Sequence, residues 1–285
     1  MKIPIDNKFS HYSTLHYRDI NLRNSISPII ANEVNKIIPL CDSIHSAEDI
    51  NSLKTTGYLK FDNFLNNQEV DELKSELSSN YGYNVHVPRL DNPENDGILR
   101  KISSDYEFNT LCYTPDSLVK NSTILNKCID PYILSLAQEY FGCFPTIFSF
   151  NSWWHIYKNQ TYGTQVDHRD YDDFKFLSLF IYLTDVDEST GPHVFHPCTQ
   201  NGSSSTCEHV ITGKAGTAIL ADTFAIHRGQ PLTQGSRLVC WWRYGLTVNS
   251  RYDEEKTCEF IVPKECIFSN IPATPHNEYL FRGFY

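Results

Sequence analysis

The chain has 285 residues, 40% hydrophobic and 13% aromatic, which is enough to bury a sizeable core in one large or two small domains. Its 24 Lys and Arg residues against 34 Asp and Glu give a formal net charge of −10, and no basic run indicates binding to nucleic acid or to an anionic membrane. The longest apolar stretch, FLSLFIYL, is too short to span a membrane, and the N-terminus lacks the apolar segment of a signal peptide.

These features predict a cytoplasmic protein whose partner is a small molecule, with neither a nucleic acid nor a membrane bound. Nine widely spaced cysteines, an odd number without a C-x-x-C pair, favour free thiols in a reducing compartment. Neither a Gly/Ser linker nor a repeat separates independent domains. We expect an N-terminal, partly helical segment 1–54, a main domain 55–250 with helical support in 55–145 and a β core in 146–250, and a C-terminal extension 251–285.

Two helices and a strand are predicted in the first half of the chain. The stretch NNQEVDELKSELSSN has the period of an amphipathic helix, with Asn66 or Asn67 as a possible cap. In DPYILSLAQEYFG, Asp130 has the N-cap position, a proline follows in the first turn, and Gly142 stands just past the end. TTGYLKFDNFL alternates like a strand, and residues 87–98 have the composition of a long loop that covers a site.

After residue 145 the sequence changes to short strands separated by turns. PTIFSFNSWWHIY, FKFLSLFIYLTDV, PHVFHP, HVITG, GTAILAD and RLVCWWRYGLTV are rich in β-branched and aromatic residues. Many short strands at near-regular spacing favour an antiparallel jelly roll. The predicted fold class is therefore mainly β with flanking helices, around a double-stranded β-helix core of jelly-roll or cupin-like type.

The stretch QVDHRDYDDF carries the strongest chemical signal. Taken alone, it is typical of a solvated acidic loop. On a strand, however, His168 and Asp170 point to the same side. They would supply two ligands of the 2-His-1-carboxylate triad that binds Fe(II) and leaves positions open.

A second histidine ligand is needed, and His193, His196, His209 and His227 are the candidates downstream. The first two are three residues apart on an expected strand, so they point to opposite faces. GTAILADTFAIHRGQP predicts a strand, a turn and a short return strand, which favours His227. Ten residues later, Arg237 begins another strand and could hold a dicarboxylate through a bidentate guanidinium contact.

With these residues in place, the sequence resembles the phytanoyl-CoA dioxygenase family of Fe(II)/2-oxoglutarate-dependent oxygenases. The resemblance rests on HRD, LFIYLTDVDESTGPH and GTAILADTFAIHRGQPLTQGSR, with TTGYLKFDNFLNNQEVDELKSEL upstream, and covers roughly residues 55 to 247. It implies that His168, Asp170 and His227 are the metal ligands and catalytic residues, that Arg237 binds 2-oxoglutarate, and that Tyr182 lies against this co-substrate.

Two departures from the family pattern stand out. The usual proline-glycine-serine-histidine segment after the glycine-proline pair is HPCTQ here, which indicates a rebuilt loop. Gly229 replaces a small hydroxyl residue two positions after the second histidine, so one hydrogen bond to the co-substrate is missing or replaced. Neither departure affects the three metal ligands.

The resemblance implies Fe(II), 2-oxoglutarate and O2 as cofactor and co-substrates, with succinate and CO2 released as an unactivated C–H bond is hydroxylated. Related halogenating enzymes have Gly or Ala at the carboxylate position, so Asp170 favours hydroxylation or another chloride-free oxidation. A small polar metabolite or a sugar-containing intermediate is the preferred substrate. One alternative is a non-catalytic jelly-roll protein that binds a small molecule or glycan, and the intact triad together with Arg237 argues against it. The alternatives among enzymes are a cupin-like isomerase and an iron dioxygenase without a co-substrate, and Arg237 argues against these two.

Several neighbouring residues have simpler interpretations. Asp172 and Asp173 are expected to form a solvated rim, and Arg228 either pairs with a carboxylate near the iron or faces solvent. His155 either packs in the core or lines the cavity.

Other aromatic residues are expected to be structural. We expect His193 and His196 to be hydrogen-bonded without binding metal, and the Trp241–Trp242 pair to fill the barrel.

Overall fold

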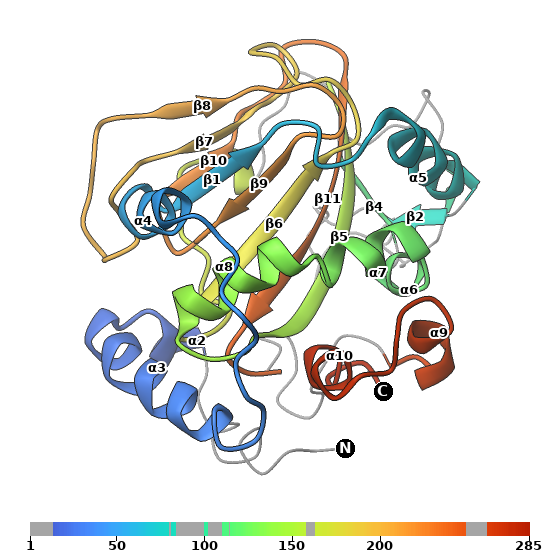
Figure 1. The fold of residues 1–285 in the computed structure, drawn as a ribbon. Coiled ribbons are helices and arrows are strands. Elements are labelled where there is room, and N and C mark those ends of the chain that lie inside the picture. Colours follow the sequence, from blue (N-terminus) through green and yellow to red (C-terminus); the bar gives the residue numbers. More distant parts are fainter. Residues whose placement is uncertain are drawn as a thin grey trace.

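The computed structural model describes seven ranges of the chain, and the predicted loop 87–98 lies outside them (Figure 1). The described residues are 14–79, 81–83, 100–101, 110–113, 115–157, 163–248 and 261–285. None of their helices is long and apolar enough to cross a membrane.

Two antiparallel sheets form the centre of the protein. The larger has the strand order β1-β9-β6-β11-β5-β4-β2-β3, and the smaller has the order β10-β7-β8. The strands of the large sheet are β1 (Tyr58–Phe61), β2 (Tyr81–Tyr83), β3 (Arg100–Lys101), β4 (Thr110–Tyr113), β5 (Thr146–Ile156), β6 (Phe176–Tyr182), β9 (Ala218–Ala221) and β11 (Ser236–Gly245). Those of the small sheet are β7 (His193–Phe195), β8 (His209–Ile211) and β10 (His227–Gly229).

The large sheet has two different faces because side chains alternate along each strand. On β11, Leu238, Cys240 and Trp242 belong to a core cluster shared with the helices. Val239 and Trp241, which lie between them, belong to a second cluster that includes residues of the small sheet. Helices therefore cover one face, and the small sheet packs against the other, as in a jelly roll. The predicted fold class is confirmed, and each of the six predicted strand segments after residue 145 contains a strand.

The helices pack against the large sheet, and α4 and α8 lie next to each other in Figure 1. The α-helices are α2 (Thr14–Tyr17), α3 (Ile20–Val34), α4 (Ala47–Thr56), α5 (Asn67–Ser79), α6 (Pro115–Val119), α7 (Ser122–Cys128), α8 (Pro131–Phe141), α9 (Lys264–Phe268) and α10 (Pro275–Leu280), and η1 (Gly163–Gln165) is a short 3-10 helix. The C-terminal segment is part of the same core, since Phe281 and Phe284 are fully buried in it.

Both predicted helices are confirmed with their caps. Asn66 accepts a hydrogen bond from the Glu69 amide at the start of α5, and the Glu69 carboxylate accepts one from the Asn66 amide. At α8, Asp130 accepts hydrogen bonds from two backbone amides, and Gly142 ends the helix in the left-handed conformation. The cysteines among the described residues are free thiols, as expected.

The cap of α8 gives a stability prediction. Asp130→Ala removes the acceptor for the Tyr132 and Ile133 amides, so the free energy of unfolding should fall by about 1 kcal/mol. Urea denaturation followed by circular dichroism measures the change. Asp71→Ala, at an exposed position within α5, is the control and should leave the midpoint nearly unchanged. Equal midpoints for the two variants would contradict the capping role.

Candidate active site

The two histidines predicted as metal ligands meet through the backbone. His168 and His227 form an isolated antiparallel bridge, and each amide donates to the other's carbonyl over 3.0 Å. The prediction that His168 and Asp170 lie on one strand is wrong. His168 forms only this isolated bridge, and residues 169–173 are not part of a strand. Instead, the Asp170 amide donates to the Thr223 carbonyl over 2.9 Å, which fixes Asp170 beside the turn that precedes His227.

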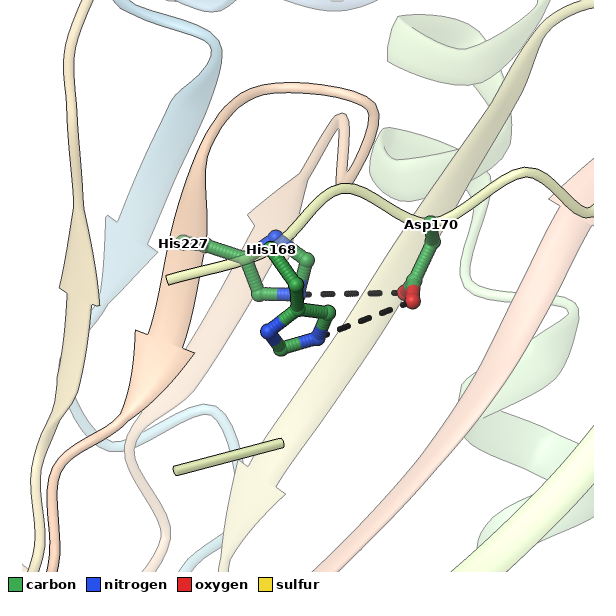
Figure 2. A group of neighbouring side chains, drawn as sticks. All are labelled: His168, Asp170 and His227. Atoms are coloured by element: carbon green, nitrogen blue, oxygen red, sulfur yellow. Dashed lines mark ion pairs between the residues drawn. The ribbon is translucent and has the colours of Figure 1, made fainter. Parts of the chain in front are cut away.

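Both imidazole rings are oriented by carbonyl groups. Nδ1 of His168 lies 2.8 Å from the Val166 carbonyl, and Nδ1 of His227 lies 3.0 Å from the Ala225 carbonyl. A carbonyl only accepts, so each Nδ1 carries the hydrogen and each Nε2 presents a lone pair. Each Nε2 lies 3.8 Å from an oxygen of Asp170, and Figure 2 shows both rings directed toward this carboxylate.

The donor set fits a divalent transition metal. One ligand atom from each of His168, Asp170 and His227 can be chosen so that all lie within 4.8 Å of one another. Burial lowers the pKa of His227 to about 4, which keeps this imidazole in the neutral form that binds metals. Two imidazoles and one carboxylate are the ligands of the 2-His-1-carboxylate triad.

A cavity of about 110 Å³ adjoins the three side chains, room for several water molecules or one small organic molecule. It contains the three candidate ligands, the predicted Arg237 and residues from both sheets. The lining residues are Asn151, Trp153, His155, Thr164, His168, Asp170, Phe180, His193, His227, Gly229, Arg237, Val239, Trp241 and Arg243.

Arg237 is a buried cation at the cavity wall. It is only 3% exposed, and burial lowers the pKa of its guanidinium to about 10, so it remains charged at neutral pH. Nη1 donates to the Gly191 carbonyl, and Nη2 lies 3.3 Å from Nδ1 of His155. Its Nε–H is buried without an acceptor, and the ion pairs of the described residues do not include Arg237. Such a cation requires an anion to offset its desolvation.

Two residues next to Arg237 bear on the sequence interpretation. A Cβ at position 229 would lie 3.0 Å from Nη2 of Arg237, so Gly229 leaves room for the guanidinium. Tyr182 is fully buried and is not among the lining residues. Its hydroxyl donates to the Ile211 carbonyl over 2.9 Å and lies 3.0 Å from Nδ1 of His193. Tyr182 therefore supports the cavity wall through His193.

The sequence interpretation missed Arg243 altogether. It lines the cavity on the same face of β11 as Arg237, six residues further on. The period-two alternation Arg237, Val239, Trp241, Arg243 was the signal that could have found it. His155 also lines the cavity, which decides between its two interpretations.

The other aromatic residues divide between wall and core. His193 and Trp241 line the cavity, while Trp242 lies in the core as expected.

The expectation that Asp172 and Asp173 form a solvated rim is wrong. Asp172 is 2% exposed and forms an ion pair with Arg243, with Oδ2 3.0 Å from Nη1. Asp173 is fully buried and accepts hydrogen bonds from the amides of Phe174, Leu246 and Thr247. Arginine and backbone N–H groups replace the water that these carboxylates would otherwise require.

Arg228 pairs with carboxylates at the surface beside the site. Its guanidinium contacts Asp167 over 2.7 Å and makes a bidentate contact with Glu208. His196 also lies near this group, with Nε2 3.2 Å from Asp167. Asp167, His196 and Glu208 have metal-ligand spacing, but the Arg228 guanidinium already supplies the positive charge between the two carboxylates.

The fold and this cluster define a jelly-roll protein with a 2-His-1-carboxylate group in a cavity between its sheets. No family model and no curated protein sequence matches the chain. Solved structures do match it. HygX from Streptomyces hygroscopicus, with nickel and 2-oxoglutarate bound, is 14% identical, with 70% of this chain and 87% of that chain covered and a TM-score of 0.52.

Two enzymes of nogalamycin biosynthesis are similarly related in fold. The non-heme alpha-ketoglutarate-dependent epimerase SnoN is 16% identical, with 70% of this chain and 81% of that chain covered and a TM-score of 0.52. The carbocyclase SnoK is 13% identical, with 70% and 83% covered and a TM-score of 0.51. At these identities the likeness shows the fold alone, a jelly roll of the same kind.

The cluster predicts metal binding that depends on both imidazoles. His168→Ala and His227→Ala should each weaken Co(II) binding by at least about 100-fold, more than an outer contact of a ligand typically contributes. Anaerobic calorimetry or Co(II) absorption measures the affinity. His276→Ala is the control, because its ring contacts the Pro39 carbonyl outside the cavity. Unchanged Co(II) stoichiometry and affinity in either cavity variant would contradict the ligand assignment.

The buried Asp173 predicts a change in stability. In Asp173→Asn, an NH2 group must face at least one of the three backbone amides, so the free energy of unfolding should fall by roughly 1–3 kcal/mol. Chemical denaturation of the metal-free protein measures this loss. A solvated Asp173 would instead give a variant as stable as the parent.

Proposed function

We propose that the chain is a non-haem Fe(II)- and 2-oxoglutarate-dependent dioxygenase of the phytanoyl-CoA dioxygenase type. It would hydroxylate an unactivated C–H bond of a small polar metabolite or a sugar-containing intermediate. One observation carries the proposal: a 2-His-1-carboxylate cluster and a buried arginine without a carboxylate partner in the described ion pairs line the same cavity.

His168, Asp170 and His227 would hold the iron. The Nδ1–H···O=C contacts of the two histidines fix both rings, so the direction of each Nε2 is determined before metal binds. Iron with 2-oxoglutarate and O2 would supply oxidation of the C–H bond, with succinate and CO2 as co-products. Because Asp170 is a carboxylate, its ligand position is filled, which supports hydroxylation.

Arg237 would bind the distal carboxylate of 2-oxoglutarate. Its burial makes an added carboxylate favourable, and its planar guanidinium suits a two-point contact. The Gly191 carbonyl and His155 hold the guanidinium in place, and Gly229 leaves space beside Nη2. Gly229 cannot donate the hydroxyl hydrogen bond that a serine or threonine would offer to the co-substrate. In return, it leaves more room for the Arg237 guanidinium.

The remaining wall of the cavity would receive the substrate. Trp153 and Trp241 meet edge to face, with ring centroids 4.9 Å apart, and Asn151 lies next to them in the lining. Aromatic surface combined with polar groups suits a sugar or a similarly polar ring. HygX has also been solved with hygromycin B, and SnoN with nogalamycin RO, at TM-scores of 0.50 and 0.51 to this chain. These complexes support a substrate of metabolite size.

The second candidate is a non-catalytic jelly-roll protein that binds a small molecule or glycan. A binding protein needs the aromatic wall but neither the triad nor a buried arginine beside it. Among enzymes of this fold, SnoN is an epimerase and SnoK is a carbocyclase. The structure of the product formed from the substrate would therefore distinguish hydroxylation from epimerisation and ring closure. A cytoplasmic location and a small-molecule substrate complete the proposal.

The proposed function predicts that Fe(II) and 2-oxoglutarate bind in turn to the protein under anaerobic conditions. Fe(II) should bind one per chain, and 2-oxoglutarate should then add a visible charge-transfer band. Under O2, succinate should form, and a metabolite that accelerates its release is a candidate substrate. An iron-loaded protein that neither develops the band nor releases succinate would support the binding-protein alternative.

Substitution of Arg237 tests co-substrate binding separately from metal binding. Arg237→Ala should raise the apparent dissociation constant for 2-oxoglutarate by roughly 10–100-fold, the equivalent of about 1.5–3 kcal/mol, while Fe(II) stays bound. Titration of the charge-transfer band measures the constant. Lys214→Ala, which removes a surface cation paired with Asp185, is the control. Equal constants for Arg237→Ala and the parent would mean that another residue anchors the co-substrate.

A further inference from the structure

Arg243 is held at three corners of its guanidinium. Nη2 lies 2.9 Å from Oδ2 of Asp170, Nη1 lies 3.0 Å from Oδ2 of Asp172, and Nε lies 3.3 Å from the hydroxyl of Ser178. Ser178 stands directly across from Arg243 in the β11–β6 register. The guanidinium therefore joins the candidate metal ligand Asp170 to the frame of the large sheet.

This contact fixes one oxygen of Asp170. Oδ2 receives the Arg243 hydrogen bond and lies 3.8 Å from Nε2 of His227, while Oδ1 lies 3.8 Å from Nε2 of His168. Without the guanidinium, the carboxylate would lose the charge-assisted hydrogen bond that helps to orient it toward the two imidazoles. Hydrogen bonds from outer residues orient metal ligands in this way in many proteins.

Asp172 addresses the charge problem that Arg243 creates. An arginine beside a metal ligand would repel a divalent cation, because its positive charge lies close to the binding position. The Asp172 side chain is 3% exposed and its carboxylate lies 3.0 Å from the same guanidinium. The Arg243–Asp172 pair is neutral as a unit, so it can orient Asp170 without adding net positive charge.

The strand geometry explains how Arg243 reaches this position. It lies on the cavity face of β11, and the β11–β5 register shifts between Arg243 and Tyr244. The extra residue at this shift is Phe148 of β5, while the β11–β6 register is unbroken through Arg243. The period-two alternation of β11 therefore places Arg243 on the cavity face, at the end of the strand opposite Arg237, where it contacts Asp170 and Asp172.

We propose that Arg243 and Asp172 are positioning residues for the metal site: Arg243 fixes the Asp170 carboxylate in the orientation that faces the two imidazoles, and Asp172 neutralises Arg243. This inference rests on the proposed function, because it assigns both residues a role in loading the metal. It predicts that a carboxylate not assigned as a metal ligand, Asp172, controls metal affinity.

The first test compares two adjacent buried acids. Asp172→Asn should weaken Co(II) binding about tenfold, because the guanidinium is drawn onto Asp170 and its charge is no longer balanced. Asp173→Asn is the matched control: its hydrogen bonds go to backbone amides, so it should lose stability but keep its Co(II) affinity within about twofold of the parent. Anaerobic competition with a chelator measures the affinities, and thermal denaturation in chelator measures stability separately.

The second test varies Arg243 itself. Arg243→Gln should weaken Co(II) binding up to about 100-fold and change the visible Co(II) spectrum as Asp170 loses its fixed orientation. Arg243→Lys keeps the charge and one hydrogen-bonding contact, so it should recover part of the affinity and the parent spectrum. If Arg243→Gln does not fold, the Asp172→Asn and Asp173→Asn pair decides the question.

The outcomes separate this inference from the proposed function. If the parent binds Co(II) but Asp172→Asn and Asp173→Asn have equal affinities, the positioning role is overturned and the proposed function stands. Equal affinities and spectra for Arg243→Lys and Arg243→Gln overturn it likewise. A parent protein that binds no divalent metal overturns both the inference and the proposed function.

Discussion

The alternation of side chains along β11 is the constraint on which the site depends. Because successive residues point to opposite faces, one ten-residue strand contributes both to the helix-packed core and to the cavity wall. Its core residues hold the large sheet against the helices. Its cavity residues place Arg237 at one end and Arg243 at the other, with Val239 and Trp241 between them. A register slip of one residue would bury both guanidinium groups among apolar helices.

The sequence was sufficient for the parts of the structure that depend on local chemistry. Asp130, Pro131 and Gly142 specify the ends of α8 because each residue type satisfies a requirement of its own turn. The pairing of His168 with His227 could be predicted because a strand, a turn and a return strand are readable in one short segment. The place of Arg237 near the candidate ligands could be predicted because it stands at the start of the next strand.

The remaining parts of the site depend on contacts between distant segments. Asp172 and Asp173 look like surface residues in a run of acids, since burying a carboxylate without partners is costly. Apart from the adjacent Phe174 amide, the partners named above come from the end of β11 and the residues that follow it, more than 70 positions away, and no local pattern indicates that pairing. The same holds for His155, whose place in the cavity follows from its register partner Arg237 on β11. The His168 segment adopts a single bridge for a related reason: backbone contacts to the turn at Thr223 replace a regular ladder.

The charged side chains around the cavity also imply an order of events. Among the described residues, Arg237 and Arg243 carry two positive charges, and Asp170 and the Asp172 that pairs with Arg243 carry two negative ones, so these four side chains together are neutral before anything binds. Under the proposed function, a divalent cation would raise the local charge by two, and the 2-oxoglutarate dianion would return it to neutrality. Each ligand would then strengthen the binding of the other, because each offsets the charge that the other brings into the cavity. Cation and dianion together would form the low-energy loaded state, and either one alone would be retained less tightly.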